Sequence, residues 1–312
     1  MKIFLPGGAG LVGINLIASM QSSNPDWEIV VVDKNLDSIK IARRIFPNVI
    51  YLCEDLSCTK NQKWPSEIKD CDICIMLQAE IGGVNDKLFE INNIKTTKLI
   101  LNELKKLGFT RIIHISSSVV NSKSSDLYTK TKRKQELIVS SHFPDSVILR
   151  PTLMFGWFDR KHLGWLSNLM VSFPFFPIPG KGQFIRQPLY VGDFCSVIKS
   201  CIYDSSLKGT YDITGLEKIK YLDLMKMLKK IKSSKTLFIY LPIPLFSLLL
   251  RLWAFISNKP AFTSSQLYAL IAGDQFELID WPKIFKVERT DIEKALNLTH
   301  NDPRYSRIKI PF

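Results

Sequence analysis

The chain has 312 residues, 46% of them hydrophobic and 23% charged, so it can bury a large core and is too apolar to be disordered. Its formal net charge of +13 would suit an anionic partner, but the basic residues are scattered without the interleaved aromatic residues of a nucleic-acid surface. We therefore expect no nucleic-acid partner, and we assign the lysines of residues 226–235 to the solvated face of a helix. Six cysteines form no disulfide framework, and the lone pair Cys71 and Cys74 leads into an apolar strand, so we expect no metal site. The first expected strand begins at the N-terminus, which predicts a cytoplasmic protein without a signal or transit peptide.

A strand, a glycine-rich turn, a helix and a second strand fill the first 33 residues. The turn contains Gly7, Gly10 and Gly13, and the second strand ends at Asp33. This order is typical of a dinucleotide-binding unit, in which the three glycines permit a tight turn, close approach of the pyrophosphate, and close packing of helix on sheet. The helix N-terminus would face the phosphates, and Asp33 would bind the adenosine ribose and repel a 2′-phosphate. We therefore predict NAD as the cofactor, with NADP less favoured.

Strand and helix patterns alternate through the first two-thirds of the chain, which predicts a Rossmann-like, doubly wound parallel sheet. Ligands of such sheets collect at the carboxyl ends of the strands, where Asp55, Ala79 and Ser116 are expected. Asp55 is placed to accept a hydrogen bond from the adenine amine, and the small Ala79 would let the cofactor pass. The further strands are expected at 49–52, 73–77, 111–115 and 147–150, and the helices between them at 37–45 and 87–107.

Tyr128 and Lys132 lie four residues apart at the start of the next expected helix, so they share one of its faces. A phenol is a poor base at neutral pH, but a nearby ammonium group and a nicotinamide cation both favour the phenolate. Tyr128 could then accept a proton from a sugar hydroxyl while a hydride passes to NAD. A serine after the preceding strand, in the run from Ser116 to Ser118, could orient the substrate oxygen.

The glycine turn and the Ser…Tyr-x-x-x-Lys set resemble the extended branch of the short-chain dehydrogenase/reductase superfamily, the NAD-dependent epimerase/dehydratase family. The resemblance places the catalytic serine at Ser118, with Ser117 as the alternative and as a substrate-binding residue. It also implies that Lys132 holds the nicotinamide ribose, that Asn92 supports this lysine, and that Glu136 fits the family pattern. Further cofactor contacts are implied at Leu11, Val12, Leu56, Ala79, Ser116 and Pro151.

The same resemblance implies a nucleoside-diphosphate sugar as the substrate and a homodimer formed through the Tyr128 helix. Arg186 looks like the arginine that reaches the substrate diphosphate just before a strand ending at Asp193, and guanidinium offers phosphate a bidentate fork. Residues 1–155 would form the NAD-binding domain, to which 184–200 return, and residues 156–312 a smaller, mostly helical substrate-binding region. Two departures are Pro6 before the glycines and a short loop, 119–127, between Ser118 and Tyr128.

Other interpretations stay open. Residues 258–273 and 287–298 are similar to a non-catalytic accessory subunit of respiratory complex I, which predicts a structural dinucleotide-binding protein. A reductase of a hydrophobic substrate would use the apolar segment 237–256 as its pocket wall. This segment is too short to span a bilayer, and we expect it to pack within the second domain, with peripheral membrane contact as the lesser alternative.

Overall fold

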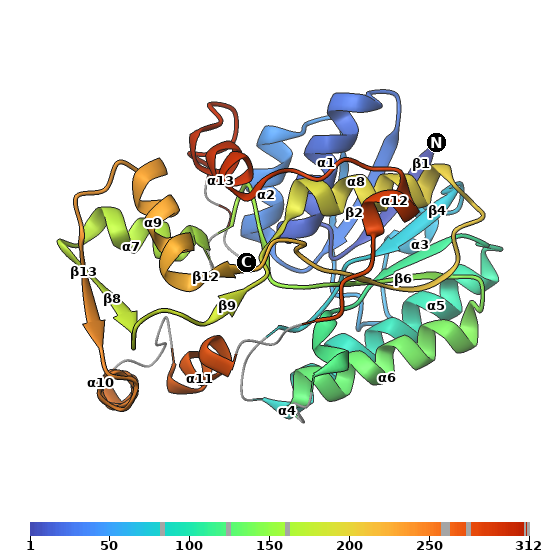
Figure 1. The fold of residues 1–312 in the computed structure, drawn as a ribbon. Coiled ribbons are helices and arrows are strands. Elements are labelled where there is room, and N and C mark those ends of the chain that lie inside the picture. The colour runs from blue at the N-terminus through green and yellow to red at the C-terminus, as the bar shows by residue number, and fades with distance from the viewer. Residues whose placement is uncertain are drawn as a thin grey trace.

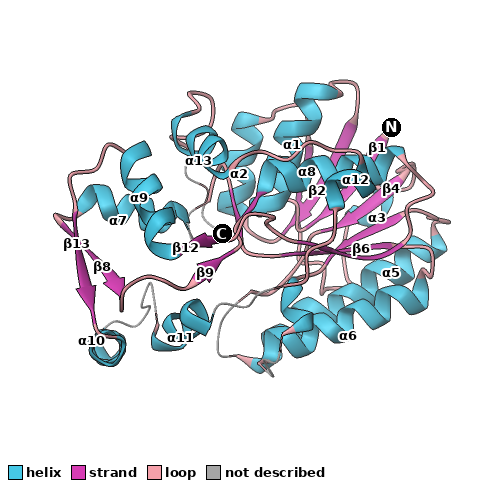
Figure 2. Ribbon diagram, in the orientation of Figure 1, coloured by secondary structure: helices cyan, strands magenta, loops and turns pink. Residues whose placement is uncertain are grey.

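The computed structural model describes residues 1–81, 85–122, 126–159, 163–256, 263–272, 276–308 and 310. A seven-stranded, fully parallel sheet organises the N-terminal part (Figures 1 and 2), in the order β11-β6-β5-β4-β1-β2-β3. Its strands are β1 (Lys2–Pro6), β2 (Glu28–Asp33), β3 (Ile50–Cys53), β4 (Ile73–Met76), β5 (Ile112–Ile115), β6 (Val147–Pro151) and β11 (Gly209–Ile213). The strand order reverses between β1 and β4, which confirms the predicted doubly wound, Rossmann-like architecture.

Helices cover both faces of this sheet. In β1, Ile3 and Leu5 belong to one apolar core and Phe4 to the other, because successive side chains of a strand point to opposite faces. Helices α1 (Leu11–Ser23), α2 (Leu36–Ile45) and α8 (Val191–Tyr203) pack on the first face, and α5 (Thr96–Lys106) and α6 (Leu127–His142) on the second (Figure 1). Continuous apolar runs in the central strands are therefore buried on two sides.

The seventh strand, β11, lies within residues 156–312, the range predicted to form the substrate-binding region. It pairs with β6 from Gly209 to Ile213 at the edge of the sheet, where its first residues are exposed. An edge strand needs no continuous apolar run, so the polar sequence of β11 gave no strand signal. Helix α12 (Trp281–Phe285) likewise returns to this domain and buries Trp281 and Phe285 in its core.

The long helix predicted at 87–107 is present but is not uniform. It begins as α4 (Asp86–Phe89), widens into a π-helical segment at Glu90–Lys95, and continues as α5 to Lys106. Gly108, with φ of +76°, ends it as predicted. Such π segments are rare and are frequent at functional sites, and this one faces the start of α6.

The C-terminal region is smaller and mostly helical, as expected. Helices α7 (Leu163–Ser172), α9 (Tyr221–Ile231) and α13 (Ile292–Asn301) enclose a third core with the parallel strands β8 (Phe175–Pro179) and β13 (Leu237–Leu241). Short ladders join it to the sheet domain, namely β7 (Met154–Phe155) with β10 (Leu189–Tyr190) and β9 (Ile185–Arg186) with β12 (Ile219–Lys220). Figure 1 shows β8, β13 and α10 (Ile243–Ile256) at the end of the molecule farthest from the sheet.

Two expectations about this region are wrong. Asp193 does not end a strand, because β10 stops at Tyr190 and Asp193 lies in the first turn of α8, where it accepts hydrogen bonds from Thr290. The apolar segment 237–256 does not pack inside the domain either, since its large side chains are mostly exposed. Helix α10 is apolar around most of its circumference, so the sequence pattern could not indicate which face turns inward. Among the helices described, none is both long enough and apolar enough to cross a membrane.

Candidate active site

The glycine turn forms a cradle between β1 and α1. Gly7 has φ of +76°, and a Cβ atom there would lie 2.6 Å from the Gln78 backbone. At Gly13 a Cβ atom would lie 2.3 Å from the Gly8 carbonyl oxygen, so only glycine lets α1 approach the turn this closely. A Cβ atom at Gly10 would meet only the Gly7 carbonyl oxygen, at 3.5 Å, and no side chain caps the helix that begins after Gly10. The exposed helix N-terminus, which includes the predicted contacts Leu11 and Val12, is suited to bind the phosphates of a dinucleotide.

Asp33 lies at the carboxyl end of β2 and faces this turn. Its carboxylate accepts hydrogen bonds from the backbone N–H groups of Ala9 (3.2 Å) and Asn35 (3.0 Å). Burial raises the pKa of Asp33, and these backbone bonds oppose the rise. The structure thus places Asp33 beside the cradle, where it could also accept ribose hydroxyl groups.

Two buried polar groups without protein partners lie at the carboxyl ends of β4 and β5. They are the Gln78 side-chain oxygen and the Ser116 hydroxyl, neither of which has a hydrogen bond among the described residues. Buried polar atoms are almost always satisfied, so such orphans point to a missing ligand or water. Together with the cradle, they fit a dinucleotide that runs from the α1 N-terminus across the sheet edge to Ser116.

Tyr128 lies in the first turn of α6, and its hydroxyl shares a hydrogen bond with Ser117. Burial raises the pKa of Tyr128, whereas this hydrogen bond lowers it. Of the two serines, Ser117 is the one whose side chain interacts with Tyr128, which favours the alternative, Ser117; the catalytic role of either serine stays a prediction. Ser117 caps the short 3₁₀ turn at Ser118–Asn121, and the buried Ser118 lies inside that turn.

Lys132 is fully buried one turn after Tyr128. Its ammonium group donates to the Ile115 carbonyl oxygen (2.9 Å) and to Gln135 Oε1 (2.7 Å). Burial lowers the pKa of Lys132 to about 7. The amine thus lies at the end of β5 and is held by two acceptors.

Of the adjacent asparagines Asn92 and Asn93, it is Asn93 whose side chain contacts α6, whereas the support of Lys132 by Asn92 stays a prediction. Asn93 is fully buried in the π segment, where its amide donates to Thr131 Oγ1 (3.0 Å) and accepts from the Glu80 N–H (2.7 Å). Asn92 is directed to the Glu80 carboxylate instead (2.5 Å). Adjacent residues of a helix point about 100° apart, and the sequence alone did not indicate which of the two faced α6.

Glu136 joins α6 to β6 through a bidentate ion pair with Arg150. The two hydrogen bonds measure 2.9 and 2.6 Å, and Arg150 also lies 3.8 Å from Asp212 on β11. The hydrogen bond to Glu136 raises the pKa of Arg150. Glu136 therefore positions the helix that carries Tyr128 and is remote from the reacting atoms.

The remaining predicted site residues lie at the sheet edge or beyond it. Asp55 accepts a hydrogen bond from the Ser57 N–H (2.8 Å), and the Leu56 side chain is buried in the second core, so only its backbone could touch a ligand. Pro151 ends β6 and is buried. Arg186 lies on β9 in the C-terminal region and donates to the Leu270 carbonyl oxygen (3.2 Å).

The family model of the NAD dependent epimerase/dehydratase family matches residues 3–213. The chain belongs to this family. The predicted family and the predicted cofactor, NAD, are thereby confirmed.

Solved structures support the fold. The UDP-glucuronic acid 4-epimerase from Bacillus cereus, in complex with UDP-glucuronic acid and NAD, aligns with a TM-score of 0.68 at 20% sequence identity. The alignment covers 96% of this chain and 99% of the epimerase. The dTDP-glucose 4,6-dehydratase from Bacillus anthracis with NAD gives a TM-score of 0.72 at 17% identity, covering 96% and 95%.

Curated relatives include proteins of another kind. The mouse (Mus musculus) protein named NADH dehydrogenase (ubiquinone) 1 alpha subcomplex subunit 9, mitochondrial, is 29% identical over 165 residues, which are 51% of this chain and 41% of the relative. The chain spans about half the length of the NADH dehydrogenase subunits that it matches. Protein FMP52-1, mitochondrial, of Scheffersomyces stipitis is 21% identical over 238 residues, 74% of this chain and 100% of that protein. Part of the predicted similarity to the complex I subunit rests on residues 258–262 and 273, which lie outside the described residues.

Proposed function

We propose that the protein is an NAD-dependent oxidoreductase of the epimerase/dehydratase type that acts on a hydroxyl group of a nucleoside-diphosphate sugar. The observation that carries this proposal is the position of Tyr128 in the first turn of α6 beside Ser117, whose side chain lowers the pKa of Tyr128. This position supports a proton-transferring pair at the carboxyl end of β5, next to Ser116, whose hydroxyl has no partner among the described residues, and on the same sheet edge as the glycine cradle.

In this proposal, three side chains have separate roles in the proton transfer. Ser117 holds the substrate oxygen, and Tyr128 takes the proton of the substrate hydroxyl, which is the role of a positioned general base. Protonated Lys132 favours the phenolate form of Tyr128 electrostatically. NAD, when bound, supplies the hydride acceptor. Asn93 and Glu136 position α6 and do not touch the reacting atoms.

The substrate class is inferred from fold neighbours and from one side chain. Several solved neighbours are complexes with a UDP-sugar. In this chain, Arg186 is the group that we propose to bind the diphosphate, because guanidinium can donate two parallel hydrogen bonds to phosphate oxygens. A sugar diphosphate would then extend from Tyr128 towards β9.

A second candidate is a non-catalytic, dinucleotide-binding subunit. Two observations favour it. In the part of the chain that the structure describes, the Lys132 amine is held by Ile115 and Gln135 and makes no hydrogen bond to Tyr128, and the relatives include NADH dehydrogenase subunits. In this case NAD would stabilise the fold by mass action. Tyr128→Phe would then leave the function of the protein unchanged.

The test is a product assay with the purified chain and NAD against UDP-, GDP-, dTDP- and CDP-sugars, read by mass spectrometry and proton NMR. Conversion of one sugar supports the proposal, and the stereochemistry of its product defines the reaction. Thermal stabilisation by NAD without conversion of any sugar would favour the second candidate. An Arg186→Met variant should raise the KM for the converted sugar and leave the Kd for NAD unchanged.

A further inference from the structure

Helix α10 presents its most apolar face to solvent. The exposed side chains Leu245, Leu248, Leu249, Leu252, Trp253 and Ile256 recur at the spacing of one helical face. Leu248 is 53% exposed, Trp253 59% and Ile256 84%. On the opposite side, Ser247 is buried and its hydroxyl has no partner among the described residues. An ordinary surface helix has the reverse arrangement.

The apolar surface continues from α10 onto the adjoining strands. β13 runs directly into α10 and pairs with β8, so that Leu237 lies opposite Phe175. Both side chains are more than half exposed, and Ile239 and Tyr240 on the same strand are exposed as well. We call this surface, formed by the exposed side chains of β8, β13 and α10, the outer apolar face. A monomer seldom exposes this many large apolar side chains on adjoining elements without a partner.

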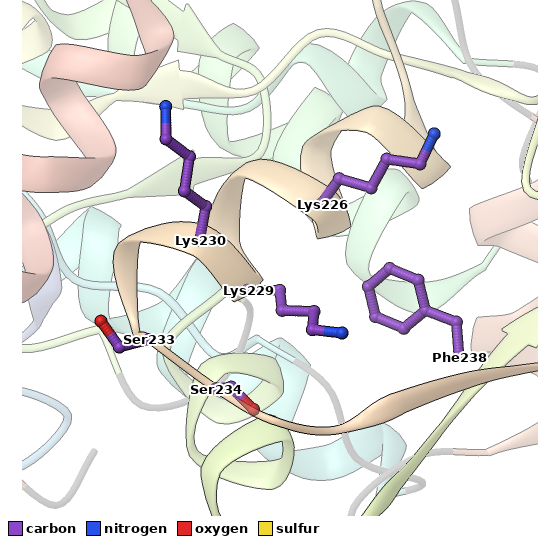
Figure 3. A pocket seen from close by; sticks show the side chains of 6 residues that line it. All are labelled: Lys226, Lys229, Lys230, Ser233, Ser234 and Phe238. Atoms are coloured by element: carbon purple, nitrogen blue, oxygen red, sulfur yellow. The ribbon is translucent and has the colours of Figure 1, made fainter.

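Lysines border this face. Helix α9 carries Lys226, Lys229 and Lys230, which line an open hollow with Phe238 of β13 (Figure 3), and the Lys229 ammonium lies 5.3 Å from the Phe238 ring centre. In the described part of the chain, Lys226 pairs with Asp223 and Lys230 with Glu293, whereas Lys229 and Lys235 form no ion pair with a carboxylate. These two positive charges are thus available to an external anion.

Acidic residues are missing from the sequence that builds this face. No aspartate or glutamate occurs from residue 224 to residue 273, or from 160 to 192, although both stretches contain basic residues. Arg251 is exposed on α10 itself, and Lys181 follows Gly180, whose N–H binds the carbonyl oxygen of Leu241 just before α10. An apolar face with a net positive border is complementary to a membrane interface that carries anionic headgroups.

We propose that the outer apolar face docks the protein onto an anionic bilayer surface. The leucines and Trp253 of α10 enter the boundary between headgroups and acyl chains, and the lysines at its border contact the headgroups. Trp253 suits this depth because its ring is amphipathic. With 14 residues and about 1.5 Å of rise per residue, α10 lies along the interface and does not cross the roughly 30 Å of hydrocarbon.

The experiment is co-sedimentation of the full chain with vesicles of phosphatidylcholine alone or mixed with phosphatidylglycerol. We expect binding to the anionic vesicles that weakens with salt. The double variant Leu248→Glu/Leu252→Glu should lower the partition coefficient at least about tenfold, because it replaces two inserting side chains by charges. Leu36→Glu, an equally drastic change of an exposed leucine on α2, is the matched control and should bind like the parent chain.

Two further measurements separate the contribution of the lysine charges from that of the inserting apolar side chains. Lys229→Glu/Lys235→Glu should weaken binding to anionic vesicles by about fivefold or more and leave the weak binding to neutral vesicles unchanged. Addition of anionic vesicles should shift tryptophan emission to shorter wavelengths, and Trp253→Phe should abolish most of that shift.

Absence of binding to anionic vesicles at low salt would overturn the proposal. So would binding that the Leu248→Glu/Leu252→Glu variant does not reduce. A dimer that this variant converts to monomers, without vesicle binding, would identify a second copy of the chain as the occupant of the face instead.

Discussion

The strands β1 and β2 and the segment from β13 to α10 are equally apolar in sequence, but the protein uses them in opposite ways. Val30, Val31 and Val32 of β2 are fully buried between two layers of helices, whereas Leu237 and most large side chains of α10 meet solvent. The difference lies in what surrounds each segment: helices cover both faces of the sheet, but β13 and α10 form the outer end of the molecule. An apolar run in the sequence therefore predicts that a segment is suited to burial. It does not predict whether the covering surface is another part of the chain or a partner.

The largest effect should come from the buried cradle. Gly13→Ala puts a methyl group 2.3 Å from the Gly8 carbonyl oxygen. Because the clashing atoms belong to the backbone, the helix or the turn would have to shift to relieve the clash. We expect a loss of unfolding free energy on the order of 3 kcal/mol. Chemical denaturation measures this loss. Gly10→Ala is the control, because its methyl group has room and should weaken NAD binding while leaving stability near that of the parent chain. Equal stability of the two variants would contradict the close packing of α1.

Loss of the ion pair between Glu136 and Arg150 should give the second largest decrease in the free energy of unfolding. Glu136→Gln removes the bidentate partner of a partly buried guanidinium, which keeps only the Asp212 carboxylate at 3.8 Å. We therefore expect a destabilisation of about 2 kcal/mol, below the range for fully buried pairs because Arg150 keeps some exposure and a second carboxylate. The same substitution in the exposed pair of Glu90 and Lys134 should cost less than about 0.5 kcal/mol. Similar losses at both sites, measured by denaturation, would show that Glu136 does not anchor α6.

Lys132 should give the next largest effect, as a dependence of stability on pH. Its pKa falls from 10.5 to about 7 on folding, so above pH 7 the unfolded chain binds the proton that the folded chain releases, and stability rises with pH. Relative to Lys132→Met, the parent chain should gain about 1 kcal/mol between pH 7 and pH 8. The difference between the two denaturation curves at each pH cancels the other titrating groups. A constant difference would show that the amine is not buried in this way.

The smallest effect should come from the outer apolar face. Leu248→Glu changes a side chain that is already exposed, so the free energy of unfolding should change by no more than about 0.5 kcal/mol. Val31→Glu, at a buried position of β2, should prevent folding. If Leu248→Glu also unfolded the protein, the contrast between the two regions would be lost.

The sequence predicted the sheet, the glycine cradle, Asp33 and Tyr128 because these features follow from local patterns: alternating strands and helices, fixed glycine spacing, and an acid at a strand end. It did not separate Ser117 from Ser118 or Asn92 from Asn93, because adjacent residues differ only in the direction of their side chains, which tertiary packing determines. The buried Gln78 and Gln135 were missed as partners at the site for a related reason, since a glutamine in a helix or after a strand carries no distinctive signal. The edge strand β11 was not predicted from the sequence, because a strand at the edge of a sheet needs few apolar residues.

The most direct test of the proposed chemistry compares the parent chain with Tyr128→Phe on the sugar that the product assay identifies. We expect turnover to fall by at least about 100-fold, as when a general base is removed, while the Kd for NAD measured by calorimetry stays the same. Turnover that survives in Tyr128→Phe would contradict the assignment of the proton transfer to Tyr128 and, with it, the active site described above.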